Sequence, residues 1–333
     1  MTAPTTTPAT ARTVPHRTAT TVLALAVPLV LTAVTVVVAL SWRGDLPDPV
    51  AVHWGVDGPD GAGSAAGFVW SSAITAAILA VGGWALAFFS GHAATTRRLG
   101  AGFSLGFAGF MSALVLGTLG VQRGVPDWTQ APSVDGVVLL TVLAGVLLAA
   151  LGAALTPGDV RAPTTARVPD DAARLPLGAD ERAGWVQHIR SRGVLVVAPV
   201  VLVPVVLVAV ILKAPTVLVP AVLVLTLLVA SMASFTVTVD GRGLSVRSGL
   251  GWPRQVVPLD EVVRAEVVHV RPFHDFGGWG YRVGRGGRVG IVVRTGEGLL
   301  VERTGGRSLV VTVDDAATAA ALLNTLADRS RVA

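Results

Sequence analysis

Long runs of apolar residues without a charged side chain dominate this sequence and constrain its fold more than any other feature. Six such runs precede residue 235, and they lie at 21–40, 69–89, 101–121, 136–155, 193–212 and 215–233. Each can cross a hydrocarbon core of about 30 Å at about 1.5 Å per helical residue. Only 14% of the residues are charged, whereas soluble domains carry about 25%. The sequence therefore predicts an integral membrane protein with six transmembrane helices.

The last two apolar runs are separated only by Lys213-Ala-Pro215. Proline removes a backbone donor and breaks the interior of a helix, so Pro215 and Pro220 favour two tight antiparallel helices over one very long helix. We therefore expect a four-helix membrane region over 18–155 and a helix pair over 193–234, joined by a linker over 156–192.

Residues 1–17 are rich in Thr, Pro and Ala. This composition is too polar to bury a core, and we expect a disordered tail. The alternative is that the tail and the apolar run after it form a cleaved signal peptide. That alternative fits less well, because the run is about 20 residues long and no clear small-x-small cleavage site follows it.

The charges of the loops predict the orientation. The loop 90–100 carries two arginines and no acid, and the linker 156–192 carries six arginines, whereas the loops 42–68 and 122–135 carry more acidic than basic residues. Basic loops stay on the cytoplasmic side of a membrane. We therefore expect a multi-pass plasma-membrane protein with both termini in the cytoplasm and the loop 42–68 outside. Three tryptophans would then share one membrane interface: Trp42, Trp70 and Trp128.

The linker contains four prolines in its polar half and cannot form one long helix. Its last part, 180–192, is predicted to form a short helix capped by Asp180. Trp185, Val186 and Ile189 would share one face of this helix beside several arginines, so the helix would lie flat on the membrane surface.

From residue 235 the pattern changes to short alternating segments between glycine turns, which is typical of β-strands. The predicted strands are 235–240, 244–248, 254–257, 262–270, 289–294, 299–303 and 308–313. Asp314 is predicted to cap a final helix over 315–329 with an apolar face of alanines and leucines. This order predicts a small β-barrel closed by a helix over 235–333. The layout, with Val257-Pro-Leu-Asp260 before the fourth strand, resembles pleckstrin-homology-like domains.

The stretch Asp45-Leu-Pro-Asp-Pro-Val-Ala-Val-His-Trp-Gly-Val-Asp-Gly-Pro-Asp-Gly61 lies between the first two apolar runs. Its prolines force extended geometry, its Asp-Gly pairs are turn signals, and the alternation from Val50 to Trp54 predicts a short strand. His53 is expected to donate to a backbone carbonyl of the loop, because the nearby carboxylates match no metal-site spacing. We predict an ordered outer loop in which eight residues either contact a ligand or hold the loop together: Pro47, Asp48, Pro49, His53, Trp54, Gly55, Asp57 and Gly58.

The glycine-rich segment 276–289 is the second candidate site. Its glycines do not match the pattern G-x-G-x-x-G between a strand and a helix, so a nucleotide site is not expected. Basic and aromatic side chains in and near it could contact anionic lipid head groups, each charge contributing about 1 kcal/mol near the surface. These side chains are Arg271, Trp279, Tyr281, Arg282, Arg285 and Arg288. The alternative is a hairpin loop whose aromatic side chains pack on the barrel or on the helices.

Catalytic motifs are missing from the sequence. It contains no G-x-S-x-G, no H-E-x-x-H and no P-loop, and its apolar runs hold no ionisable residue for an ion or proton relay. The absence of cysteine excludes disulfides and thiolate metal sites. Residues 235–333 carry 13 arginines against 10 acids, an excess too small to predict nucleic-acid binding. We expect a protein that is not an enzyme and needs no cofactor or metal.

The outer loop resembles the family called domain of unknown function 1648, which includes the SdpI-type immunity and signalling membrane proteins. The resemblance lies in Leu46-Pro-Asp-Pro49, His53-Trp-Gly55 and Asp57-Gly-Pro-Asp-Gly61 after a first apolar run. Phe276-Gly-Gly-Trp-Gly-Tyr-Arg282 resembles a segment of actinobacterial members. The sequence departs from the family at Ala62-Gly-Ser-Ala-Ala66, where a polar or basic residue often closes the motif.

This resemblance implies a location and a topology more than an activity. We expect a sensing, signalling or immunity protein whose outer loop contacts a ligand or toxin and whose inner domain contacts anionic lipid or a membrane protein partner. The alternative is a transporter or permease accessory subunit, which a polar cavity lined by Thr32, Thr35 and Ser104 would favour. A third hypothesis is a structural scaffold without a ligand.

Overall fold

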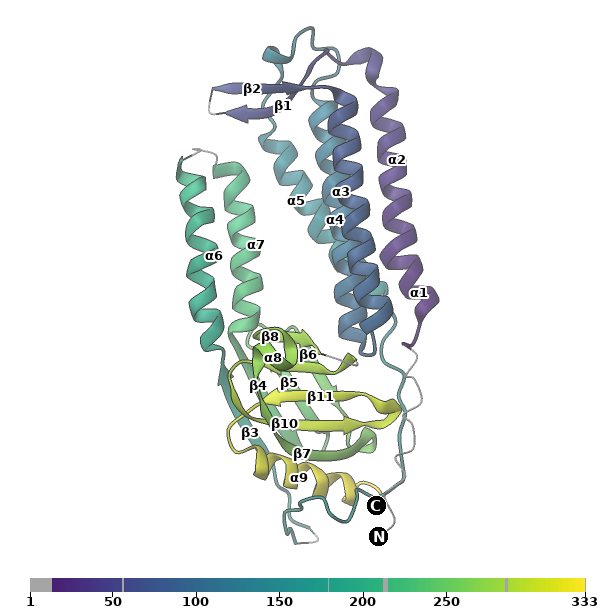
Figure 1. Ribbon diagram of the computed structural model, residues 1–333, viewed down its shortest axis with the longest axis vertical. Coiled ribbons are helices and arrows are strands. Elements are labelled where there is room, and N and C mark those ends of the chain that lie inside the picture. The colour runs from purple at the N-terminus through teal and green to yellow at the C-terminus, as the bar shows by residue number, and fades with distance from the viewer. Residues whose placement is uncertain (1–13, 56, 179, 212–214, 285–286, 333) are drawn as a thin grey trace.

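The computed structural model describes residues 14–332 except 56, 179, 212–214 and 285–286. The molecule is elongated, with helices along its middle (Figure 1). A hairpin of β1 (Val50–Gly55) and β2 (Gly58–Gly63) lies at one end, called here the hairpin end. A β-rich unit lies at the opposite end, called here the domain end.

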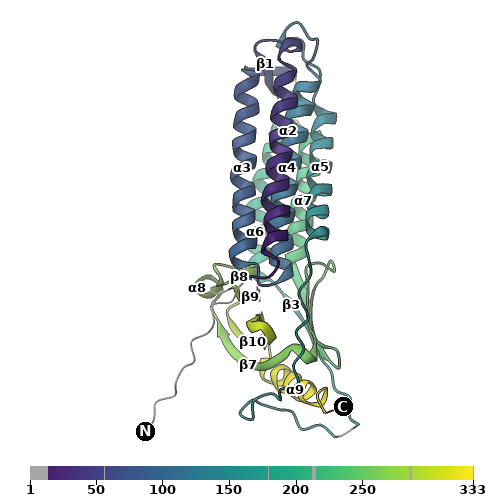
Figure 2. The same ribbon diagram turned by 90° about the vertical axis from the view of Figure 1, so that its right-hand side faces the viewer.

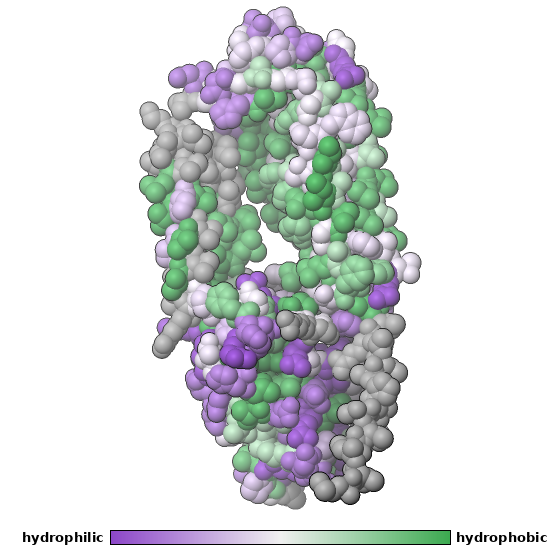
Figure 3. Space-filling view, in the orientation of Figure 1, coloured by the Kyte–Doolittle hydropathy of each residue, from purple (hydrophilic) through white to green (hydrophobic). Residues whose placement is uncertain are grey.

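Four helices are long and apolar enough to cross a membrane. The first covers Arg17–Ser41 and consists of α1 (Arg17–Thr21), a π-helical turn η1 (Val22–Ala26) and α2 (Val27–Ser41). The others are α3 (Ala65–Ser90), α4 (Ala94–Gly120) and α5 (Asp135–Leu155). They run along the long axis (Figure 2), and the visible face of the helical region is mostly apolar (Figure 3). The first four predicted apolar helices are therefore confirmed as helices of membrane-spanning length.

The predicted tail over 1–17 overlaps the first helix at its last residue. Arg17 begins the first helix, and its guanidinium carbon lies 4.7 Å from the centroid of the Phe88 ring. The part of the tail at 1–13 lies outside the described residues.

Two further helices, α6 (Arg192–Ile211) and α7 (Pro215–Ala233), stand beside the four-helix bundle and join the β-rich unit directly (Figure 1). Helix α7 begins at the proline that was predicted to separate the last two apolar runs. Within the described residues the two helices contribute only shorter apolar segments, Ala198–Leu207 and Val222–Ala233.

Helix α4 is the central helix of the bundle, because it packs against α2, α3 and α5 and more than half of its most apolar window is buried. Small residues allow this close packing. A Cβ added to Gly102 would lie 2.9 Å from the carbonyl oxygen of Ala149, and one added to Gly106 would lie 2.7 Å from the Ala149 Cβ. Gly102 and Gly106 thus bring α4 against α5, as small residues do in membrane helix pairs.

The β-rich unit contains two sheets rather than the predicted closed barrel. One sheet has the order β3-β4-β5-β6, and the other has the order β7-β10-β11-β9-β8 with β9 and β11 parallel. Within the described residues no strand pairing closes either sheet into a barrel. The strands are β3 (Trp185–Arg190), β4 (Ser234–Asp240), β5 (Gly243–Ser248), β6 (Arg254–Val257), β7 (Val262–Val270), β8 (Gly280–Val283), β9 (Val289–Val292), β10 (Gly296–Arg303) and β11 (Ser308–Thr312).

All seven predicted strands are present, two of them, β6 and β7, with the predicted bounds. The short helix α8 (Pro272–Phe276) and strand β8 were not predicted, because their glycine-rich surroundings carry no clear period. The final helix α9 (Ala316–Arg329) packs on β7 and β10. Its N-cap is Asp315 rather than the predicted Asp314, since the Asp315 carboxylate accepts the N–H of Thr318.

The predicted surface helix over 180–192 is wrong, because this segment contains strand β3. Trp185 to Arg190 pairs with Ser234 to Val239 of β4, with Ile189 opposite Phe235 in the buried core. Val186, which was placed on the same helical face as Ile189, is 58% exposed. An unpaired edge of β4 would leave backbone groups without partners, and pairing with β3 satisfies them.

The linker before β3 packs into the same core as the sheets. Val168 and Ala172 are buried there. Asn324 of α9, which is fully buried, accepts the N–H of Ala265 in β7 and donates to the carbonyl oxygens of Ala265 and Ala173. One amide side chain therefore ties the linker, β7 and α9 together.

Candidate functional site

The predicted outer loop forms the β1–β2 hairpin, which lies over one end of the membrane helices (Figure 1). The predicted strand from Val50 to Trp54 is confirmed by β1. Val50 and Ala51 are fully buried. Val50 packs in an apolar cluster with residues from three helices, Ala39, Val69, Val115 and Leu119. The start of β1 therefore holds the hairpin on the bundle.

His53 pairs with a carboxylate and not with the backbone carbonyl that we predicted. Its Nδ1 lies 2.5 Å from Oδ1 of Asp60 on the opposite strand, and both side chains are more than half exposed. Gly55 makes room for the pair, since a Cβ there would lie 2.5 Å from Oδ2 of Asp60. Exposed pairs contribute little to stability, so the pair is best suited to present a polar surface.

The remaining predicted residues lie before β1, at its end and in the turn that follows it. Strand β1 follows Pro47, Asp48 and Pro49, and the peptide bond between Asp48 and Pro49 is cis. The indole N–H of Trp54 donates to the carbonyl oxygen of Pro132 at 3.0 Å. The turn between the strands involves Gly55, Asp57 and Gly58, and Gly58 has a φ of 120°, which favours glycine.

Gln122 is the polar residue that fastens the hairpin to the bundle. It follows the end of α4 and is fully buried. Its amide accepts the N–H of Ala51 at 2.7 Å and donates to the carbonyl oxygen of the same residue at 3.0 Å. A further bond reaches the carbonyl oxygen of Thr118 at 2.9 Å. The role of Gln122 was not predicted from the sequence, although a polar residue directly after an apolar run is a signal.

Arg97 is the corresponding residue at the domain end of α4, and it is the largest fully buried side chain of the described residues. Its guanidinium donates to the carbonyl oxygens of Gly91 at 2.7 Å and Gly158 at 3.0 Å, and to Oδ1 of Asp159 at 3.3 Å. The same Oδ1 accepts the N–H of Ala94 at 2.6 Å. Arg97 thus joins the end of α3, the start of α4 and the linker. Our sequence analysis identified it only as a basic loop residue.

A chain of charges continues from Asp159 into the β-rich unit. Oδ2 of Asp159 lies 3.7 Å from Arg307, and Oε2 of Glu261 accepts from Arg307 at 3.0 Å and from Arg303 at 2.5 Å. We call Arg97, Asp159, Arg307, Glu261 and Arg303 the Arg97–Glu261 network. Because it runs from α4 through the linker to Arg303 at the end of β10 and to Arg307 in the turn before β11, it is a polar connection between the four-helix bundle and the β-rich unit.

Glu261 is the most buried acid of this network. Burial by itself raises the pKa of the Glu261 carboxyl. Its hydrogen bond and charge interaction with Arg303, helped by the N–H of Ala162 and by Arg307, outweigh this effect and hold that pKa below its ordinary value. Glu261 is therefore a carboxylate at neutral pH, as the two arginines require.

The glycine-rich segment packs against the helices through its aromatic side chains. Trp279 lies against Gly193 of α6, where an added Cβ would be 2.4 Å from Cδ2 of the indole, and its ring meets Phe273 edge to face. The Tyr281 hydroxyl lies 3.3 Å from the hydroxyl of Thr96 and 3.4 Å from the Gln255 amide. These contacts support the packing alternative for both aromatic residues.

The arginines predicted to contact lipid differ in their surroundings. Arg282 lies beside Gly278, Arg271 donates its backbone N–H to Asp275, and Arg285 falls outside the described residues. Arg288 is exposed and lines two pockets of the β-rich unit. Of the predicted set, Arg288 therefore has the surroundings best suited to a ligand.

Tyr281 provides a direct probe of this interface, because it is the only tyrosine of the chain. Burial raises the pKa of its hydroxyl to about 12, and free tyrosine titrates near about 10. We expect the phenolate absorbance of the folded protein to appear with a midpoint near pH 12, and that of the denatured protein near about 10. The stabilisation from the neutral phenol would be complete below the lower value and lost as the pH rises to the upper one. A single midpoint near 10 in folded protein would contradict the buried contact.

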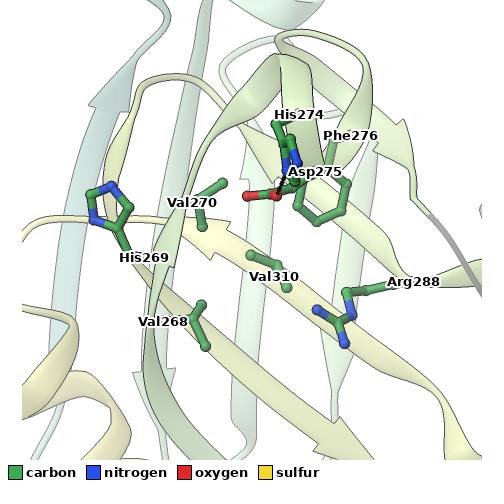
Figure 4. A pocket seen from close by; sticks show the side chains of 8 residues that line it. All are labelled: Val268, His269, Val270, His274, Asp275, Phe276, Arg288 and Val310. Atoms are coloured by element: carbon green, nitrogen blue, oxygen red, sulfur yellow. Dashed lines mark hydrogen bonds and ion pairs between the residues drawn. The ribbon is translucent and has the colours of Figure 1, made fainter.

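The first of the two pockets lies under α8 and has a volume of about 230 Å³. Figure 4 shows His274 and Asp275 side by side on α8, Val310 near the centre, and His269 and Arg288 on opposite sides of Val310. Nδ1 of His274 lies 2.7 Å from Oδ1 of Asp275. Among the described residues no three His, Cys, Asp or Glu side chains gather closely enough for a metal ion.

The pocket between α2, α3 and α4 is small. A pocket lined by Thr32 and Thr35 has a volume of about 10 Å³, close to the space that one water molecule needs. The hydroxyl of Thr35 lies 2.8 Å from the hydroxyl of Ser112. The hydroxyl of Ser104 donates instead to the carbonyl oxygen of Ala80. Ser104 does not line this pocket, so the three side chains named for a transporter cavity do not line one pocket here.

Comparison of the chain with protein-family models, with curated proteins and with solved structures gives no match.

Proposed function

We propose that this protein is a non-enzymatic membrane sensor, in which α4 links an extracytoplasmic recognition hairpin to a cytoplasmic β-rich unit. The hairpin would contact a ligand or toxin through its exposed His53–Asp60 surface. The β-rich unit would contact a membrane protein partner or lipid. Occupancy of the hairpin would change the position of α4 and with it the contacts of the β-rich unit.

One observation carries this proposal: a fully buried polar side chain lies at each end of α4. Gln122 binds both backbone groups of Ala51 in the hairpin, and Arg97 binds the linker that leads to Glu261. A helix of 27 residues is about 40 Å long at about 1.5 Å per residue, enough to span a bilayer. A rigid element anchored by specific bonds at both ends can move both sites together.

The proposed topology has six spans, with α6 and α7 crossing the membrane as a pair. Basic residues near the domain end, including Arg97 and Arg98, favour a cytoplasmic location for this end and for both termini. Three tryptophans lie in or beside elements at the hairpin end and suit the other interface: Trp42, Trp70 and Trp128.

We also propose a relationship with the family called domain of unknown function 1648, and with its SdpI-type members. The order Pro-Asp-Pro, His-Trp-Gly and Asp-Gly in the hairpin supports this relationship. The two sheets with a closing helix α9 support a relationship of the β-rich unit with pleckstrin-homology-like domains.

Replacing Gln122 by alanine tests the proposed link. The change leaves the buried N–H and carbonyl of Ala51 without partners, each costing about 1–3 kcal/mol. We expect faster amide hydrogen exchange over the hairpin residues 50–63 in lipid nanodiscs. We also expect exchange at 94–97 and 280–283 to rise roughly fivefold, which corresponds to a coupling free energy of about 1 kcal/mol.

Gln130→Ala is the matched control, because Gln130 lies near the same end and is exposed. It should leave exchange at both ends unchanged. Exchange in the core strand at 299–301 reports any general unfolding and should be equal in all three proteins. If Gln122→Ala accelerated exchange only in the hairpin, the two ends of α4 would not be linked and the proposal would be wrong.

A further inference from the structure

The second pocket of the β-rich unit lies at the turn between β10 and β11, and it has a volume of about 460 Å³. Its walls are formed by the ends of these two strands, by Val263 of β7 and by Arg288 just before β9. We call it the arginine pocket. Its polar lining consists of Arg288, Glu302, Arg303, Thr304, Arg307 and Ser308.

We propose that the arginine pocket binds a phosphate group. This inference stands on the pocket itself and does not depend on signalling through α4. Three arginines line the pocket, Arg288, Arg303 and Arg307, and a guanidinium offers several N–H donors in a planar fork that suits phosphate oxygens. A tetrahedral anion with several acceptor oxygens can be bound from several sides, whereas a planar carboxylate presents only two oxygens.

Two buried donors in the wall lack a partner. Nε of Arg303 and the hydroxyl of Thr304 are buried and make no hydrogen bond within the described residues. The Arg303 side chain is 7% exposed. Buried polar groups are nearly always satisfied, and an exception suggests an absent water or ion. Gly305 and Gly306 follow at φ 66° and 67°, a backbone conformation that favours glycine, and these two turn residues place no side chain in the pocket.

The charges near the pocket leave a positive excess. Arg303 and Arg307 share the single carboxylate of Glu261, and Asp159 is shared by Arg307 and Arg97. Arg288 makes no ion pair or hydrogen bond through its side chain in the part of the chain that the structure describes. Glu302 is the acid on the lining, and it is exposed on the face of β10. An anion would therefore meet Arg288 and the uncompensated part of the Arg303–Arg307 pair.

The place of the pocket suggests two sources for the phosphate. Arg307 contacts Asp159, which binds the start of α4, so the pocket lies close to the ends of the membrane helices. A phospholipid head group is one source, and a soluble phosphate ester is the other. The chemistry of recognition is the same for both, and only the presence of acyl chains distinguishes them.

Isothermal titration of the full-length protein in an uncharged detergent tests the proposal with three probes. These are glycerol 3-phosphate, a short-chain phosphatidic acid and a short-chain phosphatidylcholine. We expect binding of phosphatidic acid, alone or together with glycerol 3-phosphate, and no binding of phosphatidylcholine. Equal affinity for the first two assigns the site to the phosphate group itself, and binding of phosphatidic acid alone assigns it to a lipid.

Two variants locate the binding without disturbing Glu261. Arg288→Gln should weaken binding about tenfold through the loss of a charged donor, and Thr304→Val roughly threefold through the loss of one hydroxyl. Arg254→Gln, an exposed arginine of β6 outside the pocket, should bind as the wild-type protein does. The proposal is overturned if no phosphate probe binds, if phosphatidylcholine binds as well as phosphatidic acid, or if Arg254→Gln weakens binding as much as Arg288→Gln.

Discussion

Replacing Arg97 by methionine is expected to lower the free energy of unfolding by about 3–5 kcal/mol, the usual cost of removing one partner of a buried ion pair. Methionine fills much of the space but donates no hydrogen bond. The carbonyl oxygens of Gly91 and Gly158 would lose the guanidinium of the fully buried Arg97. Oδ1 of Asp159 would lose its ion pair and keep the N–H of Ala94. The end of α3 and the linker would then separate from α4.

Arg98→Met is the control for this prediction. It removes the same charge from the next residue of α4, whose side chain is only partly buried. We expect the detergent-solubilised Arg97→Met protein to unfold at a clearly lower temperature and Arg98→Met to stay close to the wild-type protein. Equal loss in both variants would show that net positive charge near the membrane, and not the bonds of Arg97, stabilises this end.

The elements of this fold were largely predictable from local pattern. Uncharged runs identified four helices long and apolar enough to cross a membrane, and period-two alternation identified β6 and β7 with their observed bounds. Strand β3 was not predictable, because six residues with three apolar side chains fit a helix face as well as a strand. Its partner β4 begins 44 residues after β3 ends, and Ser234 pairs directly with Arg190. Only the tertiary structure decides between these alternatives.

The site residues were predictable only where their role is local. The hairpin follows from its own prolines, glycines and alternation. Gln122 is 71 residues from Ala51, and Arg97 is 61 residues from Gly158, so their roles depend on contacts that no local pattern contains. In the sequence, Arg97 is an arginine beside an apolar run, as expected for a cytoplasmic loop. An arginine that is buried among carbonyl oxygens looks the same in the sequence.

Glu261→Gln is the second change with a large expected effect. Glu261 is 2% exposed and accepts from Arg303 and Arg307, whose side chains are 7% and 12% exposed. A neutral amide would leave these two cations without their common anion, and we expect the free energy of unfolding to fall by about 3 kcal/mol. Since Arg303 and Arg307 line the arginine pocket, phosphate binding should also change in this variant.

The pH dependence of stability separates this effect from a simple loss of packing. Arginine neighbours hold the pKa of Glu261 below its ordinary value against the opposing effect of burial. The carboxylate therefore stabilises the fold above the unfolded pKa of about 4.3, and this contribution is lost as the pH falls through the lower folded value. Wild-type protein should lose stability below about pH 4 more steeply than Glu261→Gln. Glu297→Gln, at an exposed position of β10, should retain the wild-type acid profile. If Glu261→Gln kept that profile too, the charge of Glu261 would not be what joins Arg303 and Arg307 to the linker.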